Sequence, residues 1–191
     1  MSAATDPIRN LKELKALANY YLKRGELRNY TLVVLGVHTA LRISDLLRLK
    51  WEDVYDSDKG RLRDHLVVVE KKTGKTRKIA LNCEALHALA VYFPYHKGNY
   101  IFSNHRKAEH AISRVQAWRI IRAAAAALGL SGHISCHSLR KTWGYNAWAR
   151  AKIRPELIMT VYNHSSFEIT KRYLGITQDD LDQAYRRMKL F

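Results

Sequence analysis

The stretch from Asp64 to Leu81, DHLVVVEKKTGKTRKIAL, is the part of the sequence that most restricts the fold. Two runs of strand-favouring residues, HLVVVE and TRKIAL, flank KKTGK, in which Gly74 can supply the positive φ of a tight turn. The sequence on both sides of this hairpin has mainly helical periodicity. We therefore predict a mainly α fold with a small antiparallel β-sheet, of the α+β class.

Helical patterns precede the hairpin. Asp6 as N-cap and Pro7 at the first helical position predict an amphipathic helix that ends at Gly25. A mostly buried helix over residues 28–38 and a helix over residues 42–51 are expected to follow.

The sequence after the hairpin is also mainly helical. NCEALHALAVYF predicts a helix up to Pro94, NYIFSN predicts a short edge strand, and a helix is expected from near Ser113 to Gly129. Four further helical segments follow to the C-terminus. Since no repeat, low-complexity tract or linker divides the chain, residues 1–191 are expected to form one compact domain.

The composition is strongly basic. Lys and Arg number 33 against 17 Asp and Glu, which gives a formal net charge of +16. A polyanionic partner is therefore expected, with nucleic acid ahead of an anionic membrane. The longest apolar stretch, YTLVVLGVHTAL, is interrupted by His38 and is too short to cross a bilayer, so a membrane role is not favoured.

The cysteines indicate a reducing compartment. Cys83 and Cys136 are the only two, no CxxC occurs, and nothing resembles a secretory signal. Disulfides and a thiolate metal site are therefore not expected, and the predicted location is the cytoplasm.

HSLR is the first candidate for chemistry. His137 and Arg140 are three residues apart and share a face if the segment is helical. A histidine beside a permanent cation suits a phosphate oxygen, which arginine can bind with two donors while histidine transfers a proton. Taken alone, the pair is more simply explained as two surface side chains.

Arg42 is the second candidate, because it lies between the apolar segment VHTAL and ISDLLRL, whose leucines require burial. Asp45, three residues on, could hold the guanidinium while its other donors face a ligand. A purely structural Arg–Asp helix pair explains the same residues.

Lys72 lies at the tip of the hairpin, where an ammonium group can protonate a leaving oxygen or bind phosphate. Lys71 and Lys75 compete for this role. For any one of them, a solvated turn lysine is the plainer interpretation.

The stretch HSSFEITKRYLGI places His164 nine residues before Tyr173. Ser165 and Glu168 form a capping-box pattern that starts a short helix, and Gly175 can end it. A straight helix at ~1.5 Å per residue would separate the two backbones by roughly 13 Å, so the side chains need not touch. A packed tyrosine is the plainer interpretation of Tyr173 on its own.

In their order along the chain, ALRISDLLRL, KKTGK, HSLRKT and NHSSFEITKRYLGI resemble the signature boxes of the tyrosine recombinase, or phage integrase, family. The resemblance spans nearly the whole chain and implies the fold of that family's catalytic domain. It implies a DNA strand transferase, here a site-specific recombinase or integrase.

The resemblance also implies a role for each boxed residue. Arg42 and Arg140 would clamp the scissile phosphate, and His137 and His164 would bind it and assist proton transfer. Tyr173 would attack phosphorus and form a 3′-phosphotyrosyl link, which conserves bond energy for rejoining. Lys72 matches the family's general acid, and Asp45 matches the acidic position that supports the first arginine. Cationic clamps can neutralise the developing charge, so we predict no cofactor and no metal.

The chain departs from the family pattern at three places. Tyr162 and Asn163 stand before His164 where Leu-Gly is usual, and Ala40 replaces a usual glycine. Full-length relatives carry an N-terminal core-binding domain that completes a clamp round DNA, and we expect this chain to lack it. It would be a naturally minimal recombinase, like the small fimbrial phase-switch invertases, or a part of a larger integrase, and Met1 favours the former.

The last predicted helix carries an apolar stripe at Leu181, Ala184, Tyr185 and Met188. Packing on its own domain would explain the stripe. In the family this helix often docks in a neighbouring protomer, so the resemblance implies double-stranded DNA as partner and a homo-oligomer on it, a tetrameric synapse with exchange of this helix.

Two other functions fit part of the pattern. A non-cleaving DNA-binding regulator would keep the fold and the charge, but has no need of the complete reactive set. A type IB topoisomerase would share the chemistry and relax DNA with one active subunit. The sequence does not identify the target site, because base readout depends on the groove contacts and on DNA deformability.

Overall fold

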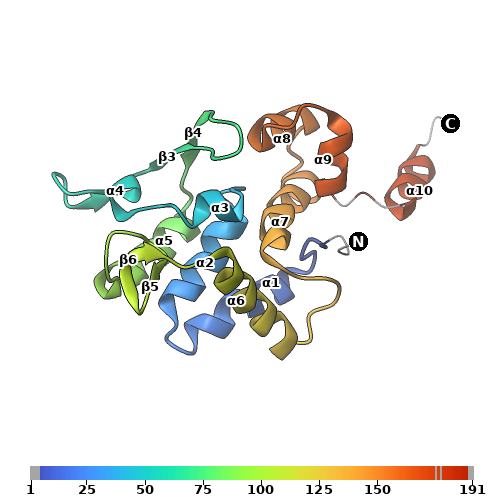
Figure 1. Ribbon diagram of the computed structural model, residues 1–191. Helices are drawn as coiled ribbons and strands as arrows, with labels where there is room; N and C mark the ends of the chain where they lie inside the picture. Colours follow the sequence, from blue (N-terminus) through green and yellow to red (C-terminus); the bar gives the residue numbers. More distant parts are fainter. Residues whose placement is uncertain (1–4, 175, 177, 189–191) are drawn as a thin grey trace.

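The computed structural model describes residues 5–174, 176 and 178–188. Helices dominate these residues, and the strands are short (Figure 1). The helices are α1 Leu11–Leu22, α2 Leu27–His38, α3 Ile43–Leu46, α4 Trp51–Val54, α5 Cys83–Tyr92, the 3₁₀ helix η1 Phe93–Tyr95, α6 Arg114–Ala127, α7 Cys136–Ala149, α8 Pro155–Tyr162, α9 Phe167–Leu174 and α10 Gln178–Arg187. The strands are β1 Tyr55–Asp56, β2 Arg61–Leu62, β3 His65–Val69, β4 Thr76–Ala80, β5 Ser103–Asn104 and β6 Lys107–Ala111.

The strands pair as antiparallel hairpins, β1 with β2, β3 with β4 and β5 with β6. In the β3–β4 hairpin, Leu66 lies opposite Ile79 and Val68 lies opposite Arg77. Leu66 and Val68 are buried while Val67 and Val69 are exposed, as the two-residue period of a half-buried strand requires. The predicted hairpin and the mainly α fold class with small antiparallel sheets are therefore confirmed.

Helix α2 is the centre of the fold. Its residues 29–37 are all buried, and it packs against α1, α5 and α7. One cluster of buried side chains joins α2 to the β3–β4 hairpin and α5, and a second joins it to α1 and α6. A smaller third cluster, around Ala40, Tyr162 and Leu174, packs α7, α8 and α9 together. This third cluster supports the candidate site.

The predicted start of the first helix was wrong. The first helix begins at Leu11, because Asn10 accepts a hydrogen bond from the backbone N–H of Lys12 at 2.9 Å. The Asp6 carboxylate accepts from the backbone N–H of His133 instead, at 2.9 Å, so it ties the N-terminal segment to the start of α7 and does not cap a helix.

The single helix expected over residues 42–51 is also wrong. It is divided into α3 and α4, since Arg42 and Lys50 have extended backbones and each precedes a separate short helix. The backbone N–H of Trp51 donates a hydrogen bond to the carbonyl of Asn99 at 2.9 Å, which anchors α4 to the segment before β5. Tertiary pairing therefore outweighs the helical periodicity here.

Most other expected helices agree with the structure. Ser113 caps α6 by a capping box with Gln116, and Pro155 occupies the first turn of α8. The helix expected just after His164 begins at Phe167. Its expected end at Gly175 lies outside the described residues. The β1–β2 pair and strand β6 were not predicted, because two-residue strands and the polar segment KAEHA carry no clear alternation.

Helix α10 stands apart from the helices α7, α8 and α9 in Figure 1. The side chains of Leu181, Tyr185 and Met188 are exposed, so these three residues do not pack on the rest of the domain. None of the helices in the described ranges combines the length and the apolar character that a bilayer span requires.

We predict that Gly144→Ala lowers the free energy of unfolding by about 2 kcal/mol, although alanine is the better helix former. A Cβ at residue 144 would clash with the hydroxyl of Tyr162 and lie 2.9 Å from its Cε2, and Tyr162 is fully buried. Denaturant unfolding should show a smaller cost of Gly144→Ala in a Tyr162→Leu background. An equal cost in both backgrounds would contradict the clash.

Candidate active site

Arg140 lies at the centre of the site. Helix α7 positions its side chain, which is 1% exposed. Its Nη1 donates to the backbone carbonyl of Ala40, and its Nη2 donates to the carbonyl of Tyr162 at 3.0 Å. Its Nε has no hydrogen-bond partner in the described structure. Burial lowers the pKa of Arg140 to about 10, so the group stays cationic at neutral pH.

Two left-handed residues aim the carbonyls at this guanidinium. Ala40 has φ 54° and Asn163, directly after Tyr162, has φ 52°. Tyr162 is the last residue of α8, so its carbonyl is one of those that a helix end leaves without an intrahelical partner. A cation bound there is also favoured by the negative end of the helix dipole.

Tyr162 provides a second support for Arg140. The guanidinium carbon lies 4.5 Å from the centre of the tyrosine ring, a cation–π contact. The Tyr162 hydroxyl donates to the backbone carbonyl of Arg140 at 2.6 Å. Burial raises the pKa of Tyr162, which therefore stays neutral and acts as packing.

Tyr173 packs into an aromatic group beside Arg140. Its ring centre lies 4.7 Å from that of His164, 4.9 Å from that of Tyr162 and 5.1 Å from that of His137. The Arg140 guanidinium carbon lies 5.8 Å from the same ring. A tyrosine, two histidines and an arginine therefore meet at one place, from α7, α9 and the loop between α8 and α9.

The contact between His164 and Tyr173 differs from the expected wide separation. The residues between them do not form one straight helix, since α9 starts only at Phe167 and the chain turns after Asn163. His164 Nδ1 lies 3.0 Å from Thr170 Oγ1, which holds the imidazole against α9. The ring of His164 thereby reaches that of Tyr173 in the last turn of α9.

Arg42 is held by Glu70, and not by Asp45 as the sequence suggested. Arg42 Nη1 lies 2.8 Å from Glu70 Oε2, and Arg77 Nη1 lies 2.9 Å from Glu70 Oε1. Thr73 also donates to Glu70, at 2.9 Å. Burial opposes ionisation of this fully buried carboxyl, but the hydrogen bonds from Arg77, Arg42 and Thr73 outweigh it and lower the pKa of Glu70 to about 2.

Asp45 supports the hairpin turn instead. Its Oδ1 accepts from the backbone N–H of Lys71 at 2.9 Å, and its side chain is 1% exposed. The predicted pair with Arg42 assumed a continuous helix, whereas Arg42 is the extended N-cap of α3. Asp45 therefore acts on the turn that carries the three lysines.

The hairpin turn approaches α8 in Figure 1, and one hydrogen bond joins them. Lys75 Nζ donates to Asn163 Oδ1 at 2.9 Å, next to His164. Lys72 is exposed at the same turn, and in the described part of the chain its ammonium has no bonded partner. Of the three competing lysines, Lys72 is therefore available to a ligand while Lys75 is engaged.

Both histidines are neutral at pH 7. Burial together with the charges of Arg140 and Arg42 lowers the pKa of His164 to about 4. One side of His137 is exposed, yet burial of its ring and the neighbouring charges of Lys141, Arg140 and Arg42 lower its pKa to about 4 as well. Neutral imidazoles can accept a proton, and an added anion would raise their pKa.

The structure thus brings four of the predicted residues into contact, namely His137, Arg140, His164 and Tyr173. It places Arg42 and the turn that carries Lys72 beside them. Sequence reasoning missed Glu70 and Tyr162. A signal for Glu70 was present, because Leu66, Val68 and Glu70 follow the buried period of the strand. No group of His, Cys, Asp and Glu side chains that could hold a metal occurs in the described ranges.

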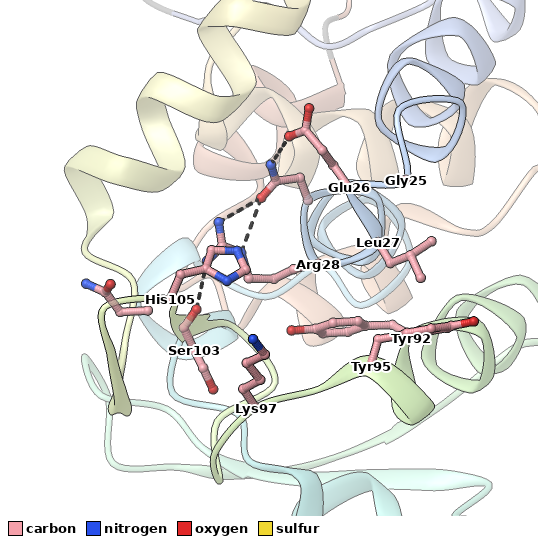
Figure 2. A pocket seen from close by; sticks show the side chains of 11 residues that line it. Gly25, Glu26, Leu27, Arg28, Tyr92, Tyr95, Lys97, Ser103 and His105 are labelled. Carbon is pink, nitrogen blue, oxygen red and sulfur yellow. Dashed lines mark hydrogen bonds between the residues drawn. The ribbon is translucent and has the colours of Figure 1, made fainter.

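A separate hollow of about 690 Å³ lies between the start of α2, η1 and β5 (Figure 2). In it, Arg28 donates to the carbonyl of Ser103 at 2.8 Å and to the side chain of Asn29, which in turn donates to Glu26 at 2.6 Å. None of the predicted site residues lines this hollow.

Residues 9–179 match the model of the phage integrase family. The chain is 41% identical over 181 residues to the probable integrase/recombinase YoeC of Bacillus subtilis, with 94% of each chain covered. The chain belongs to the phage integrase family.

This chain spans a smaller share of some other relatives. The tyrosine recombinase XerA of Pyrococcus furiosus is 28% identical, and the match covers 94% of this chain and 60% of that protein. The crystal structure of XerA recombinase shares the fold at a TM-score of 0.77 with 21% identity, over 98% of this chain and 67% of that one. A post-cleavage complex of XerH site-specific recombinase bound to difH has a TM-score of 0.76 with 18% identity. The match covers 97% of this chain and 54% of that one.

Two of the departures from the expected boxes fall at residues with a left-handed backbone. Ala40 and Asn163 are the two positions at which the resemblance led us to expect glycine, and both have positive φ. The backbone thus keeps the conformation that glycine adopts most easily. The changes in sequence leave the carbonyls on Arg140 in place.

We predict that the protein loses stability as the pH falls from about 6.5 towards 4. The two histidines have folded pKa values of about 4 against about 6.5 in an unfolded chain, so the unfolded state binds more protons in this window. Their contribution is fully present above pH 6.5. Chemical unfolding at several pH values should show a shallower loss for His164→Gln.

The matched control for this titration is His87→Gln, at an exposed histidine on α5. This variant removes one histidine outside the site and supplies the reference slope for His164→Gln. A slope that is the same in His164→Gln and in the unchanged protein would show that His164 does not titrate as proposed.

Proposed function

We propose that this protein is a site-specific DNA recombinase that cuts and rejoins strands through a 3′-phosphotyrosyl intermediate. The observation that carries the proposal is the contact group of Tyr173, His137, His164 and Arg140. The buried and unpaired Nε of Arg140 supports it, because a phosphate oxygen would satisfy this donor. Family membership supports the same reaction class.

The proposed reaction has two bond changes at phosphorus. Tyr173 Oη attacks the scissile phosphate and the bond from phosphorus to the 5′ oxygen breaks, which leaves the 3′-phosphotyrosyl ester and a free 5′ hydroxyl. The hydroxyl proton of Tyr173 passes to a neutral histidine, and Lys72 gives a proton to the leaving oxygen. Arg42 and Arg140 neutralise the charge that develops on the oxygens.

The proposed partner is double-stranded DNA, which the net charge of +16 supports. Among the structural relatives, XerH recombinase is bound to its palindromic difH substrate, and lambda integrase is a dimer bound to a core site. We propose by analogy that this chain assembles on DNA as a homo-oligomer, a tetrameric synapse with exchange of α10. Its proposed location is the cytoplasm, and no cofactor is required.

We predict that Tyr173→Phe abolishes covalent capture of DNA while DNA binding persists. Phenylalanine keeps the packing against His137 and His164 and lacks the nucleophile. Nicked suicide duplexes that carry the candidate site prevent rejoining, so adducts should accumulate with the unchanged protein. Gels under denaturing conditions measure the adduct, and retardation of native complexes measures binding.

Tyr95→Phe is the matched control, because Tyr95 is 68% exposed at the hollow of Figure 2 and away from the site. This variant should form adducts like the unchanged protein. DNA binding without an adduct on every duplex tested, including the true target, would favour the non-cleaving regulator. Relaxation of supercoiled DNA without site preference would favour the topoisomerase.

We also predict that Lys72→Ala slows adduct formation about 10²–10³-fold on ordinary DNA and much less on a duplex with sulfur in place of the 5′ bridging oxygen. A thiolate leaves without a proton, so the sulfur substrate removes the need for a general acid. Lys71→Ala and Lys75→Ala serve as comparisons. Recovery with sulfur in one of those variants, and not in Lys72→Ala, would assign the acid to that lysine.

A further inference from the structure

We propose that Glu70 is a positioning residue for DNA cleavage, which sets both the guanidinium of Arg42 and the turn that carries Lys72. The inference rests on the proposed function, since it concerns the geometry of that same site. Glu70 directly follows β3 and is two residues before Lys72. Glu70 lies just outside the sequence box KKTGK, which begins at Lys71.

The contacts of Glu70 reach both sides of the site. Its two carboxylate oxygens bind different arginines, Arg42 at 2.8 Å and Arg77 at 2.9 Å. These arginines come from the start of α3 and from β4, so the carboxylate joins two elements that are separate in the sequence. Without its charge, two guanidinium groups would face each other with no counterion between them.

The same residue closes the lysine turn. The backbone carbonyl of Glu70 accepts from the N–H of Gly74 at 2.8 Å, and its N–H donates to the carbonyl of Lys75 at 3.0 Å. The Thr73 hydroxyl donates to its carboxylate. The turn is thereby held at its base from inside the fold, while Lys72 remains exposed.

Burial makes this arrangement rigid. Glu70 is fully buried, so water does not compete for the carboxylate and the paired side chains have few alternative positions. A buried ion pair is weak evidence for stability, because desolvation offsets the attraction. Orientation of the groups that bind the reacting phosphate is the better explanation, since small displacements of such groups reduce rates strongly.

Positioning and general stabilisation have different consequences for DNA binding. Glu70→Gln removes a negative charge beside phosphate-binding cations, so DNA affinity should stay the same or increase. Cleavage should nevertheless slow, because Arg42 and the turn lose their fixed geometry. A variant that simply unfolds more easily would lose binding and cleavage together.

The experiment compares the full chain with Glu70→Gln and Glu70→Asp. It measures duplex affinity, the single-turnover rate of adduct formation on suicide duplexes, and the same rate with the 5′ bridging sulfur. We expect Glu70→Gln to bind as tightly and to form adducts ~10²-fold more slowly, with partial recovery on the sulfur substrate. Glu70→Asp keeps the charge but is one methylene shorter, so its rate should be intermediate.

Asp56→Asn is the matched control. Asp56 also pairs with two cations, Arg63 at 3.3 Å and Lys59 at 4.0 Å, in the β1–β2 hairpin, which contributes none of the site residues. Its adduct rate should be unchanged.

The outcomes separate this inference from the proposed function. If the unchanged protein forms adducts and Glu70→Gln forms them at the same rate, the positioning role is overturned and the function stands. An equal loss of affinity and rate in Glu70→Gln would also overturn it, in favour of a structural role. If the unchanged protein forms no adduct on its site, the proposed function fails and this inference fails with it.

Discussion

A buried guanidinium held by two backbone carbonyls is the interaction on which the rest of the site depends. Arg140 joins the segment after α2, through the carbonyl of Ala40, to the end of α8, through the carbonyl of Tyr162. The ring of Tyr162 covers its face, and Tyr173 packs beside it. Since neutral carbonyls bind the cation without cancelling its charge, Arg140 stays attractive to an anion although it is desolvated.

The site contains several arginine and lysine side chains, and its two acidic side chains are buried. Glu70 and Asp45 are 0% and 1% exposed. Glu70 binds Arg42 and Arg77 through its two carboxylate oxygens, whereas Asp45 binds the backbone of Lys71 through Oδ1 alone. The histidines stay uncharged at pH 7 because burial and nearby cations disfavour a further proton. A phosphate that enters would relieve this repulsion, so binding of the substrate and protonation of the histidines are expected to favour each other.

The sequence predicted the hairpin, most helices and the groups that could react, because these follow from periodicity, turn residues and motif order. It predicted the partners of those groups poorly. Asp45 was expected to hold Arg42, but a residue distant in sequence, Glu70, does so once the strand folds against α3. The contact of His164 with Tyr173 depends on where α9 begins, and local propensity fixes such boundaries only to within a few residues.

The left-handed residues Ala40 and Asn163 also affect the unfolded chain. A side chain at either position costs about 1 kcal/mol in the native backbone, yet it leaves the unfolded chain fewer conformations than glycine would. The two effects on the free energy of unfolding oppose each other. Both residues nevertheless have less backbone conformational freedom than glycine would have at the same position. The two carbonyls that bind Arg140 therefore have little freedom to turn away from its guanidinium.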